Sequence, residues 1–178
     1  MTEKDLANEL EMGEMIDRLA QNVIDENDLN EMVLVGIRSR GVPLAEWLAQ
    51  SIEKIKSVKV PVGSLDINLY RDDLSEVNEQ PLVQKTELPF KITGRGIILV
   101  DDVLYTGRTI RAAMDELIDF GRPRFIRLLV MVDRGWRELP IEASYIGMKI
   151  ETSLEENIKV MVRPIDPENK ILKRSNGS

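Results

Sequence analysis

Runs of apolar residues recur along the chain, and the longer ones are each followed by a polar turn, which leads into a helical pattern after the runs at 32–37 and 97–100. The runs cover residues 32–37, 97–100 and 125–132, and a shorter one covers residues 159–162. Uninterrupted apolar runs of this length are typical of strands buried on both faces of a parallel sheet. Their alternation with helices predicts an α/β fold with a mostly parallel, twisted sheet flanked by helices.

Three stretches carry apolar residues at helical spacing. The first runs from about Asp5 to Asp25, the second is opened by Pro43, and the third follows Thr109 and ends at Gly121. The residues expected to face inward are Leu6, Leu10, Met15, Leu19 and Val23 in the first stretch, Leu44, Leu48, Ile52 and Ile55 in the second, and Ile110, Ala113, Met114, Leu117 and Ile118 in the third.

The middle and the end of the chain depart from this pattern. Residues 58–70 alternate between apolar and polar, but the alternation slips at Gly63 and Ser64, which predicts a bulge or tight turn in an antiparallel hairpin. Residues 71–95 are polar and aperiodic, so they are interpreted as a mobile loop that closes over a reactive centre, or as a plain surface loop. The polar tail, residues 170–178, is expected to be frayed.

Composition narrows the choice of function. The chain has 178 residues, 43% hydrophobic and 31% charged, which fits a single domain spanning residues 1–178. It contains no cysteine and no histidine, which excludes disulfides, thiol chemistry, and histidine-based catalysis or metal binding. Its net charge of −7 does not favour nucleic acid as a partner, although a local basic patch could still bind it. No apolar run reaches transmembrane length, so we expect a soluble, cytoplasmic protein without membrane contacts.

The most informative polar segment follows the run at 97–100. Asp101 and Asp102 come directly after the strand, and a turn of sequence T-G-R-T, residues 106–109, opens the next helix. Backbone N–H groups and hydroxyls at a helix N-terminus suit a phosphate, and Gly107 lets the backbone approach it. Two carboxylates would repel phosphate, but they can accept hydrogen bonds from sugar hydroxyls or lie near a metal. The pattern predicts a sugar phosphate with a free diol; the alternative is an ordinary strand–helix turn with a capping threonine.

Two other strand ends carry polar groups. Arg38, Ser39, Arg40 and Gly41 follow the run at 32–37 and lead into a helix, which is typical either of an anion site or of a solvated turn. Residues 133–140 follow the run at 125–132. In a parallel sheet these three strand ends lie at one edge, where open α/β folds bind ligands.

Four segments carry a family resemblance. V-D-D-V-L-Y-T-G-R-T-I-R-A-A-M-D-E-L, residues 100–117, resembles the phosphoribosyl-pyrophosphate (PRPP) motif of the type I phosphoribosyltransferases. The longer match is similar to the PyrR family of pyrimidine-operon regulators with uracil phosphoribosyltransferase activity. V-G-I-R-S-R-G-V-P-L-A at 35–45, D-I-N-L-Y-R-D-D-L at 66–74 and D-R-G-x-R-E-L-P-I at 133–141 also resemble that family.

The resemblance implies a site for uracil and PRPP, which react to UMP and pyrophosphate. PRPP would be bound by Ser39, Arg40, Gly41, Asp101, Asp102, Val103, Leu104, Tyr105, Thr106, Gly107, Arg108 and Thr109. Uracil would be bound by Asp133, Arg134 and the backbone at Val160, and the catalytic candidates are Asp101, Asp102, Arg40 and Arg71. Mg²⁺ is the expected cofactor, held mainly by PRPP rather than by a protein metal site. Trp136 could stack on a base or cover apolar surface.

The resemblance also implies a homo-oligomer that binds pyrimidine-operon mRNA under the control of UMP or UTP, with Arg18 and Arg137 as RNA contacts. Four positions differ from RNA-binding members, in which Thr, His, His and Arg are expected: Asp17, Gln21, Trp136 and Glu142. Because phosphate contacts dominate RNA affinity, these changes predict weakened, lost or retargeted RNA binding. The alternatives are a regulator with little catalysis and a phosphoribosyltransferase for another base; a Rossmann domain is disfavoured because no G-x-G-x-x-G follows a strand.

Overall fold

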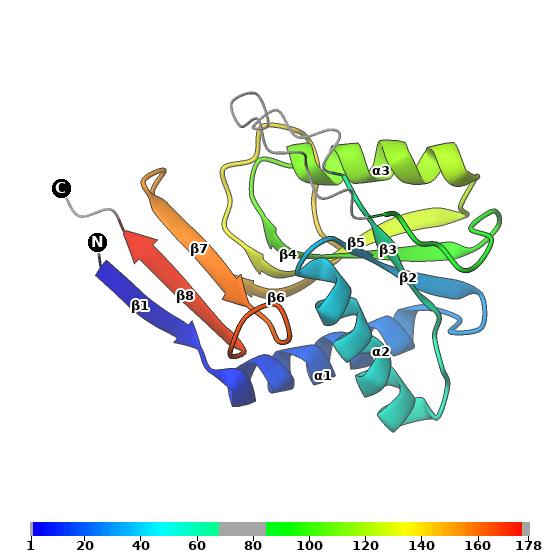
Figure 1. The fold of residues 1–178 in the computed structure, drawn as a ribbon, viewed down its shortest axis with the longest axis horizontal. Coiled ribbons are helices and arrows are strands. Elements are labelled where there is room, and N and C mark those ends of the chain that lie inside the picture. Colours follow the sequence, from blue (N-terminus) through cyan, green and yellow to red (C-terminus); the bar gives the residue numbers. More distant parts are fainter. Residues whose placement is uncertain (1, 68–84, 176–178) are drawn as a thin grey trace.

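The computed structural model describes residues 2–67 and 85–175, which form two sheets and three helices (Figure 1). A five-stranded sheet has the order β3-β2-β4-β5-β6, with all neighbours parallel. A three-stranded antiparallel sheet has the order β1-β8-β7. The elements are β1 (Thr2–Ala7), α1 (Glu9–Glu26), β2 (Met32–Ile37), α2 (Gly41–Lys56), β3 (Val62–Leu65), β4 (Gly96–Leu104), α3 (Arg108–Phe120), β5 (Phe125–Asp133), β6 (Tyr145–Lys149), β7 (Glu156–Met161) and β8 (Lys170–Ser175). The predicted α/β class is confirmed.

The central strands are apolar throughout because helices cover both faces of the sheet. α1 and α2 pack on one face and α3 on the other (Figure 1). In β2, Leu34 belongs to the core beneath α1 and α2, whereas Val33 and Val35 belong to the core beneath α3. Alternate residues of one strand therefore enter two different cores, which explains the unbroken hydrophobic run.

The order of the strands reverses direction between β2 and β4. From β2 the chain passes through α2 to β3 on one side, whereas β4, β5 and β6 follow one another on the other side. Loops that leave the carboxyl ends of β2 and β4 therefore diverge, and open α/β sheets bind ligands in the crevice between such loops. Gly41 lies so close to β4 that a side chain there would contact the Val100 carbonyl, which places the start of α2 directly beside β4.

The predicted N-terminal helix begins too early. Residues 2–7 form β1, and α1 begins at Glu9 after Asn8, whose Oδ1 accepts from the Glu11 N–H at 2.9 Å while Glu11 Oε2 accepts from the Asn8 N–H at 2.8 Å. This reciprocal capping box ends the strand and fixes the helix register. Leu10 is consequently exposed, and Met12 and Ile16 are buried instead.

The prediction of a frayed tail is wrong for the described residues up to 175. Residues 170–175 form β8, the middle strand of the antiparallel sheet, with Ile171 and Leu172 buried. Its polar residues are matched across the strands, since Lys170 pairs with Asp5 at 2.9 Å. Residues 176–178 lie outside the described residues. The predicted strand at 159–162 is β7, which begins three residues earlier, at Glu156, and ends at Met161.

The predicted hairpin at 58–70 is also wrong within the described residues. Only residues 62–65 form a strand, β3, and it pairs in parallel with β2 without a slip in register. Leu88 and Phe90 lie so close to Gly63 that a side chain there would collide with them. The glycine at this position interrupts the alternation of apolar and polar residues, and this interruption suggested a bulge.

The segment interpreted as a mobile loop is only partly described. Residues 71–84, including Arg71, lie outside the described residues. Residues 85–95 have fixed contacts: Glu87 exchanges two backbone hydrogen bonds of 2.8 Å with Ser64, and Ile92 is buried. The C-terminal part of the predicted loop is therefore attached to the edge of the sheet.

Most inward positions of the later helices are confirmed, but their ends differ. Ile55 and Ile118 are exposed, and each lies in the last turn of its helix. α2 begins at Gly41, before Pro43, and α3 begins at Arg108, inside the predicted turn. Among the described helices, none is long and apolar enough to span a bilayer.

Candidate functional site

Asp101 and Asp102 lie within β4 rather than after it, because the strand continues to Leu104. Asp101 is only 7% exposed, and its Oδ1 accepts from the Asp102 N–H at 2.9 Å. Asp102 is half-buried, and its Oδ1 accepts from the Val103 N–H at 2.8 Å. The two carboxylates are thus held by backbone donors of their own strand, at the carboxyl end of the central strand.

The T-G-R-T turn leads from β4 into α3 without a side chain that caps the helix. Gly107 occupies the N-cap position with a φ of 93°, a conformation that favours glycine. Thr106 Oγ1 accepts from the Arg108 N–H at 3.3 Å, and the carbonyl of Thr106 accepts from the N–H groups of Glu138 and Leu139. The start of α3 therefore retains backbone N–H groups of its first turn for an anion.

The loop after β2 places Arg40 at the N-cap of α2, again without a side-chain cap. Arg40 Nε and Nη2 each donate to a different oxygen of Asp166 at 2.9 Å. Asp166 raises the pKa of Arg40, burial opposes this, and the charge of Asp102 adds to the increase. Arg40 is therefore a cation whose charge interacts with that of Asp102. Because Gly41, the next residue, packs on the Val100 carbonyl of β4, the loop after β2 lies beside the strand that carries the acid pair.

The third strand end joins the same edge. The Arg134 N–H donates to the Leu104 carbonyl at 3.1 Å, which links the ends of β4 and β5. Arg134 is 5% exposed, and its guanidinium lies 4.1 Å from the centre of the Tyr105 ring. Its Nη2 donates to the carbonyl of Glu156 at 2.7 Å, whereas Nε is buried and has no hydrogen-bond partner among the described residues.

Asp133 is held by its own loop. Its Oδ1 accepts from the Gly135 N–H at 3.0 Å, and its Oδ2 accepts from Arg137 at 2.8 Å. Burial raises the pKa of Asp133, but the hydrogen bonds from Arg137 and Gly135 and the charge of Lys149 outweigh it, so the net pKa is lowered. Asp133 is therefore an ionised carboxylate beside the buried Arg134.

Comparisons with known proteins identify the family of the chain. The model of the phosphoribosyl transferase domain matches residues 3–165. A protein named bifunctional protein PyrR from Thermus aquaticus is 51% identical over 168 residues, 94% of this chain and 93% of that protein. The protein of the same name from Pelotomaculum thermopropionicum is 52% identical over 156 residues, 87% of this chain and 86% of that protein. The chain belongs to the PyrR group of phosphoribosyltransferases.

Solved structures show the same fold. The hypoxanthine-guanine phosphoribosyltransferase of Bacillus anthracis superposes with a TM-score of 0.73 at 18% identity and covers 96% of each chain. The hypoxanthine phosphoribosyltransferase of Staphylococcus aureus gives a TM-score of 0.67 at 19% identity, over 85% of this chain and 80% of that chain. At this identity the likeness concerns the type I phosphoribosyltransferase fold alone, which was the predicted one.

The two arginines that the PyrR resemblance suggests for RNA are both engaged within the protein. Arg18 donates to the Gly147 carbonyl at 2.5 Å. Arg137 donates to the carbonyls of Tyr105 and Ile141 as well as to Asp133, and it is mostly buried. In this structure Arg137 is therefore a part of the loop that supports Asp133, and an RNA contact would require it to exchange those partners.

Other candidate residues are spread around this edge. Trp136 is 46% exposed, and its Nε1 donates to the Thr152 carbonyl at 2.6 Å, so its ring lies against the loop before β7. Val160 is buried in the core with its backbone in β7. Arg108 pairs with Glu138 at 2.7 Å on the surface.

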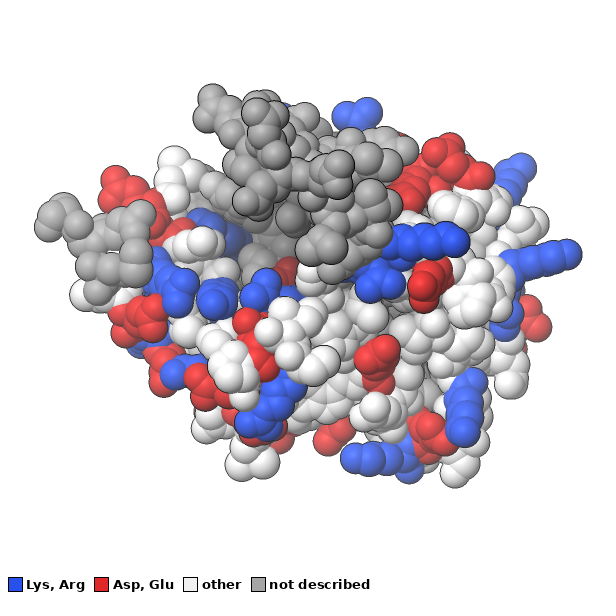
Figure 2. Space-filling view, in the orientation of Figure 1, with Lys and Arg blue, Asp and Glu red and all other residues white. Residues whose placement is uncertain are grey.

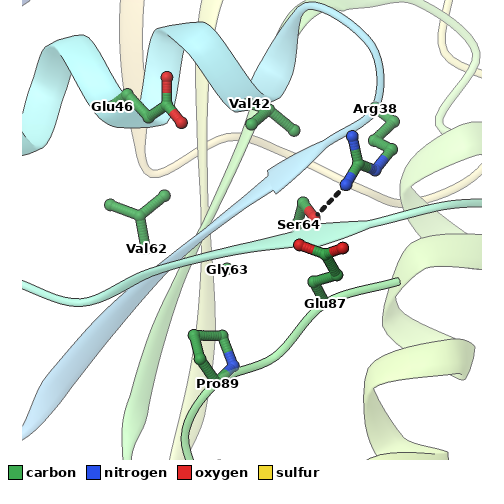
Figure 3. A pocket seen from close by; sticks show the side chains of 8 residues that line it. All are labelled: Arg38, Val42, Glu46, Val62, Gly63, Ser64, Glu87 and Pro89. Carbon is green, nitrogen blue, oxygen red and sulfur yellow. Dashed lines mark hydrogen bonds between the residues drawn. The ribbon is translucent and has the colours of Figure 1, made fainter. Parts of the chain in front are cut away.

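A pocket of about 280 Å³ lies beside the loop that follows β2 (Figure 3). Arg38 enters it from that loop and donates from Nη2 to Ser64 Oγ of β3 at 2.9 Å, while its buried Nε lacks a partner among the described residues. Arg38 thus ties the loop to the sheet edge. The sequence did not show this contact, because a bulge or turn was predicted at Gly63 and Ser64, where the structure has β3.

Proposed function

We propose that the protein transfers the phosphoribosyl group of PRPP to uracil and releases UMP and pyrophosphate. The observation that carries this proposal is the reversal of strand order between β2 and β4, where Gly41 at the start of α2 packs on the Val100 carbonyl next to Asp101 and Asp102. The close relationship to PyrR proteins over nearly the whole chain supports it.

Each part of PRPP has a matching group at this edge. The 5′-phosphate suits the backbone N–H groups in the first turn of α3, with the hydroxyls of Thr106 and Thr109. The ribose hydroxyls suit Asp101 and Asp102, because a carboxylate accepts hydrogen bonds from several hydroxyls. The pyrophosphate suits Ser39, Arg40 and Gly41 at the start of α2, the second helix N-terminus at this edge.

The reaction forms a bond between the anomeric carbon and N1 of uracil while the bond to the pyrophosphate oxygen breaks, and the N1 proton is released to the departing pyrophosphate or to solvent. Positive charge develops on the ribose ring, and negative charge grows on the departing pyrophosphate. Asp101 and Asp102 stabilise the first and Arg40 the second, so catalysis depends on positioning and electrostatics rather than on a histidine base. Arg71 is assigned to the same leaving group by resemblance, and it lies outside the described residues.

The base side offers complementary groups for a uracil edge. The buried Nε of Arg134 is an unused donor among the described residues, and uracil presents carbonyl oxygens. The ionised Asp133 can accept from a uracil N–H, and the backbone near Val160 provides further acceptors and donors. The ring of Tyr105 stacks on the guanidinium of Arg134 and holds it in place.

Magnesium fits this site as a ligand-bound ion. Among the described residues, no group of three or more acidic side chains lies together in a way that could hold a metal ion. Mg²⁺ usually takes few protein carboxylates and keeps substrate phosphates and water. Bound in this way, it would neutralise charge on the pyrophosphate.

A base competition assay tests the activity. With PRPP and Mg²⁺, we expect uracil to be converted to UMP, and hypoxanthine and guanine to give at most about a hundredth of that rate, because a site built for one hydrogen-bonding edge rejects another. A purine used as well as uracil would favour a phosphoribosyltransferase for another base. Absence of any turnover would favour the alternative, a regulator with little catalysis.

A second activity, regulation of a pyrimidine operon through its leader RNA, is favoured by the word bifunctional in the relatives' names. We propose that this activity is weak here. On the face shown in Figure 2, Lys and Arg are interspersed with Asp and Glu rather than gathered in one basic surface. Arg137 forms an ion pair with Asp133, so its charge is partly neutralised within the protein. The exposed Glu142 adds a negative charge on the same loop, which would repel RNA phosphates.

Binding of the leader RNA with and without UMP, over a series of salt concentrations, tests this proposal. We expect a shallow salt dependence, and a gain of about tenfold in affinity for Glu142→Arg, because one phosphate contact adds nearly one unit to the salt slope. Asp17 is a poorer target, since it accepts from Ser51 at 2.6 Å between α1 and α2. Tight, steeply salt-dependent, UMP-stimulated binding of the wild type would contradict the proposal.

A further inference from the structure

Asp166 is a buried carboxylate in the turn between β7 and β8, 126 residues from Arg40 along the chain. It is 8% exposed, and four hydrogen bonds surround it. Its Oδ2 accepts from Arg40 Nε at 2.9 Å and from the Val162 N–H at 2.8 Å, its Oδ1 accepts from Arg40 Nη2 at 2.9 Å, and its own N–H donates to the Val162 carbonyl at 2.9 Å. The two hydrogen bonds with the Val162 backbone hold the carboxylate in place independently of Arg40.

The turn of the small antiparallel sheet thus contacts the predicted pyrophosphate loop through the bidentate pair of Arg40 and Asp166. The turn between β7 and β8 packs near the first turns of α2, where Pro43 and Glu46 line one groove together with Arg163 and Pro164. The backbone of Arg40 is fixed from the other side, because Gly41 packs on the Val100 carbonyl of β4. Backbone and guanidinium of Arg40 are accordingly held by two different sheets.

We propose that Asp166 is a positioning residue for pyrophosphate, which acts by holding the guanidinium of Arg40 in one orientation. The pair engages Nε and Nη2, and no hydrogen bond joins Nη1 to the described residues, so Nη1 and the cationic charge remain for the ligand. A long side chain that is already ordered loses less conformational freedom when it binds. The inference rests on the proposed PRPP site and deepens it, since it assigns a role to a residue outside the motifs.

Two effects of Asp166 have opposite signs, which makes the proposal testable. If it orders Arg40, its removal weakens pyrophosphate binding. If it merely competes with pyrophosphate for Arg40, or repels it, its removal strengthens binding. Calorimetric titration with magnesium pyrophosphate, and separately with UMP, distinguishes the two, because UMP needs the ribose, 5′-phosphate and base groups but not the pyrophosphate loop.

For Asp166→Asn we expect the Kd of magnesium pyrophosphate to rise about tenfold and that of UMP to change less than about twofold, as for the loss of one charged hydrogen-bonding partner. Glu168→Gln is the matched control, because it removes an exposed carboxylate from the same turn. No side-chain hydrogen bond joins Glu168 to the other described residues, and its charge interacts with that of Lys170. We expect both Kd values to be unchanged in this control.

A double variant tests whether Asp166 acts through Arg40. In an Arg40→Ala background, adding Asp166→Asn should weaken pyrophosphate binding no further. If Asp166→Asn does not fold, as judged by circular dichroism, Asp166→Glu should give a smaller loss of pyrophosphate affinity in a folded protein. Tighter pyrophosphate binding, or equal losses for pyrophosphate and UMP, would overturn the inference alone. No pyrophosphate binding by the wild type would overturn the proposed function itself.

Discussion

At the scale of single residues, Asp166 is held as an ionised group. The hydrogen bond from Arg40 lowers the pKa of Asp166, burial opposes it, and the Val162 N–H adds to the lowering. Because its pKa in the folded state is below that of the unfolded chain, this carboxylate stabilises the fold above the ordinary carboxyl pKa. The contribution is lost as the pH falls through the lowered pKa.

Urea denaturation as a function of pH checks this assignment. We expect the free energy of unfolding of the wild type to decrease between about pH 5 and pH 2, as ionised carboxylates that are paired in the folded state take up protons. The decrease should be smaller in Asp166→Asn, which has one such group fewer. The same pH dependence in both proteins would contradict an Asp166 carboxylate that is ionised and paired with Arg40.

Residues next to strand ends could be predicted from the sequence, and distant partners could not. The acid pair, the T-G-R-T turn and Arg40 follow apolar runs directly, so their place at one sheet edge follows from the α/β pattern. Asp166 follows no such run, and its partner is 126 residues away. The assignments of ligand to each site residue stay predictions until a ligand is bound.

At the scale of elements, α1 illustrates how a local signal fixes a boundary. Asn8 and Glu11 satisfy each other's backbone N–H groups at the start of the helix. Replacing Asn8 by Ala should lower the free energy of unfolding by about 1 kcal/mol, because one N-terminal donor loses its acceptor. Uracil turnover should be unchanged, since this end of α1 takes no part in the proposed site.

The measurement is urea denaturation beside a turnover assay, with Asn22→Ala as the control. Asn22 is exposed in the C-terminal half of the same helix, and no hydrogen bond joins its side chain to the other described residues. Its replacement should leave stability within about 0.5 kcal/mol of the wild type. Equal losses for the two variants would show that the capping box does not stabilise α1.

Elements buried on two faces were predictable, and those of the small sheet were not. β2, β4 and β5 are continuous apolar runs because helices cover both sides. β1 and β8 mix charged and apolar residues, and they pair across almost the full length of the chain. Leu6 and Leu10 have the four-residue spacing of a helix, so the helix was predicted to begin too early. The N-x-x-E sequence at Asn8 is a capping-box signature that indicates the actual start of α1.

At the scale of the whole molecule, the site depends on the joining of two sheets. The parallel sheet supplies the ends of β2, β4 and β5, and the antiparallel sheet supplies Asp166 and the Glu156 carbonyl, which hold Arg40 and Arg134. Both sheets pack on the core beneath α1 and α2. The antiparallel sheet therefore orients cations at both ends of the proposed PRPP and uracil site, a role that the motifs did not reveal.

The central claim is that three strand ends bind one PRPP molecule. A crystal structure of the protein with PRPP and Mg²⁺ tests it most directly. We predict the 5′-phosphate within hydrogen-bonding distance of the backbone N–H groups at the start of α3, the ribose hydroxyls on Asp101 and Asp102, and the pyrophosphate on the loop of Ser39 to Gly41 with Arg40. A 5′-phosphate bound elsewhere, or a pyrophosphate without contact to that loop, would contradict the account.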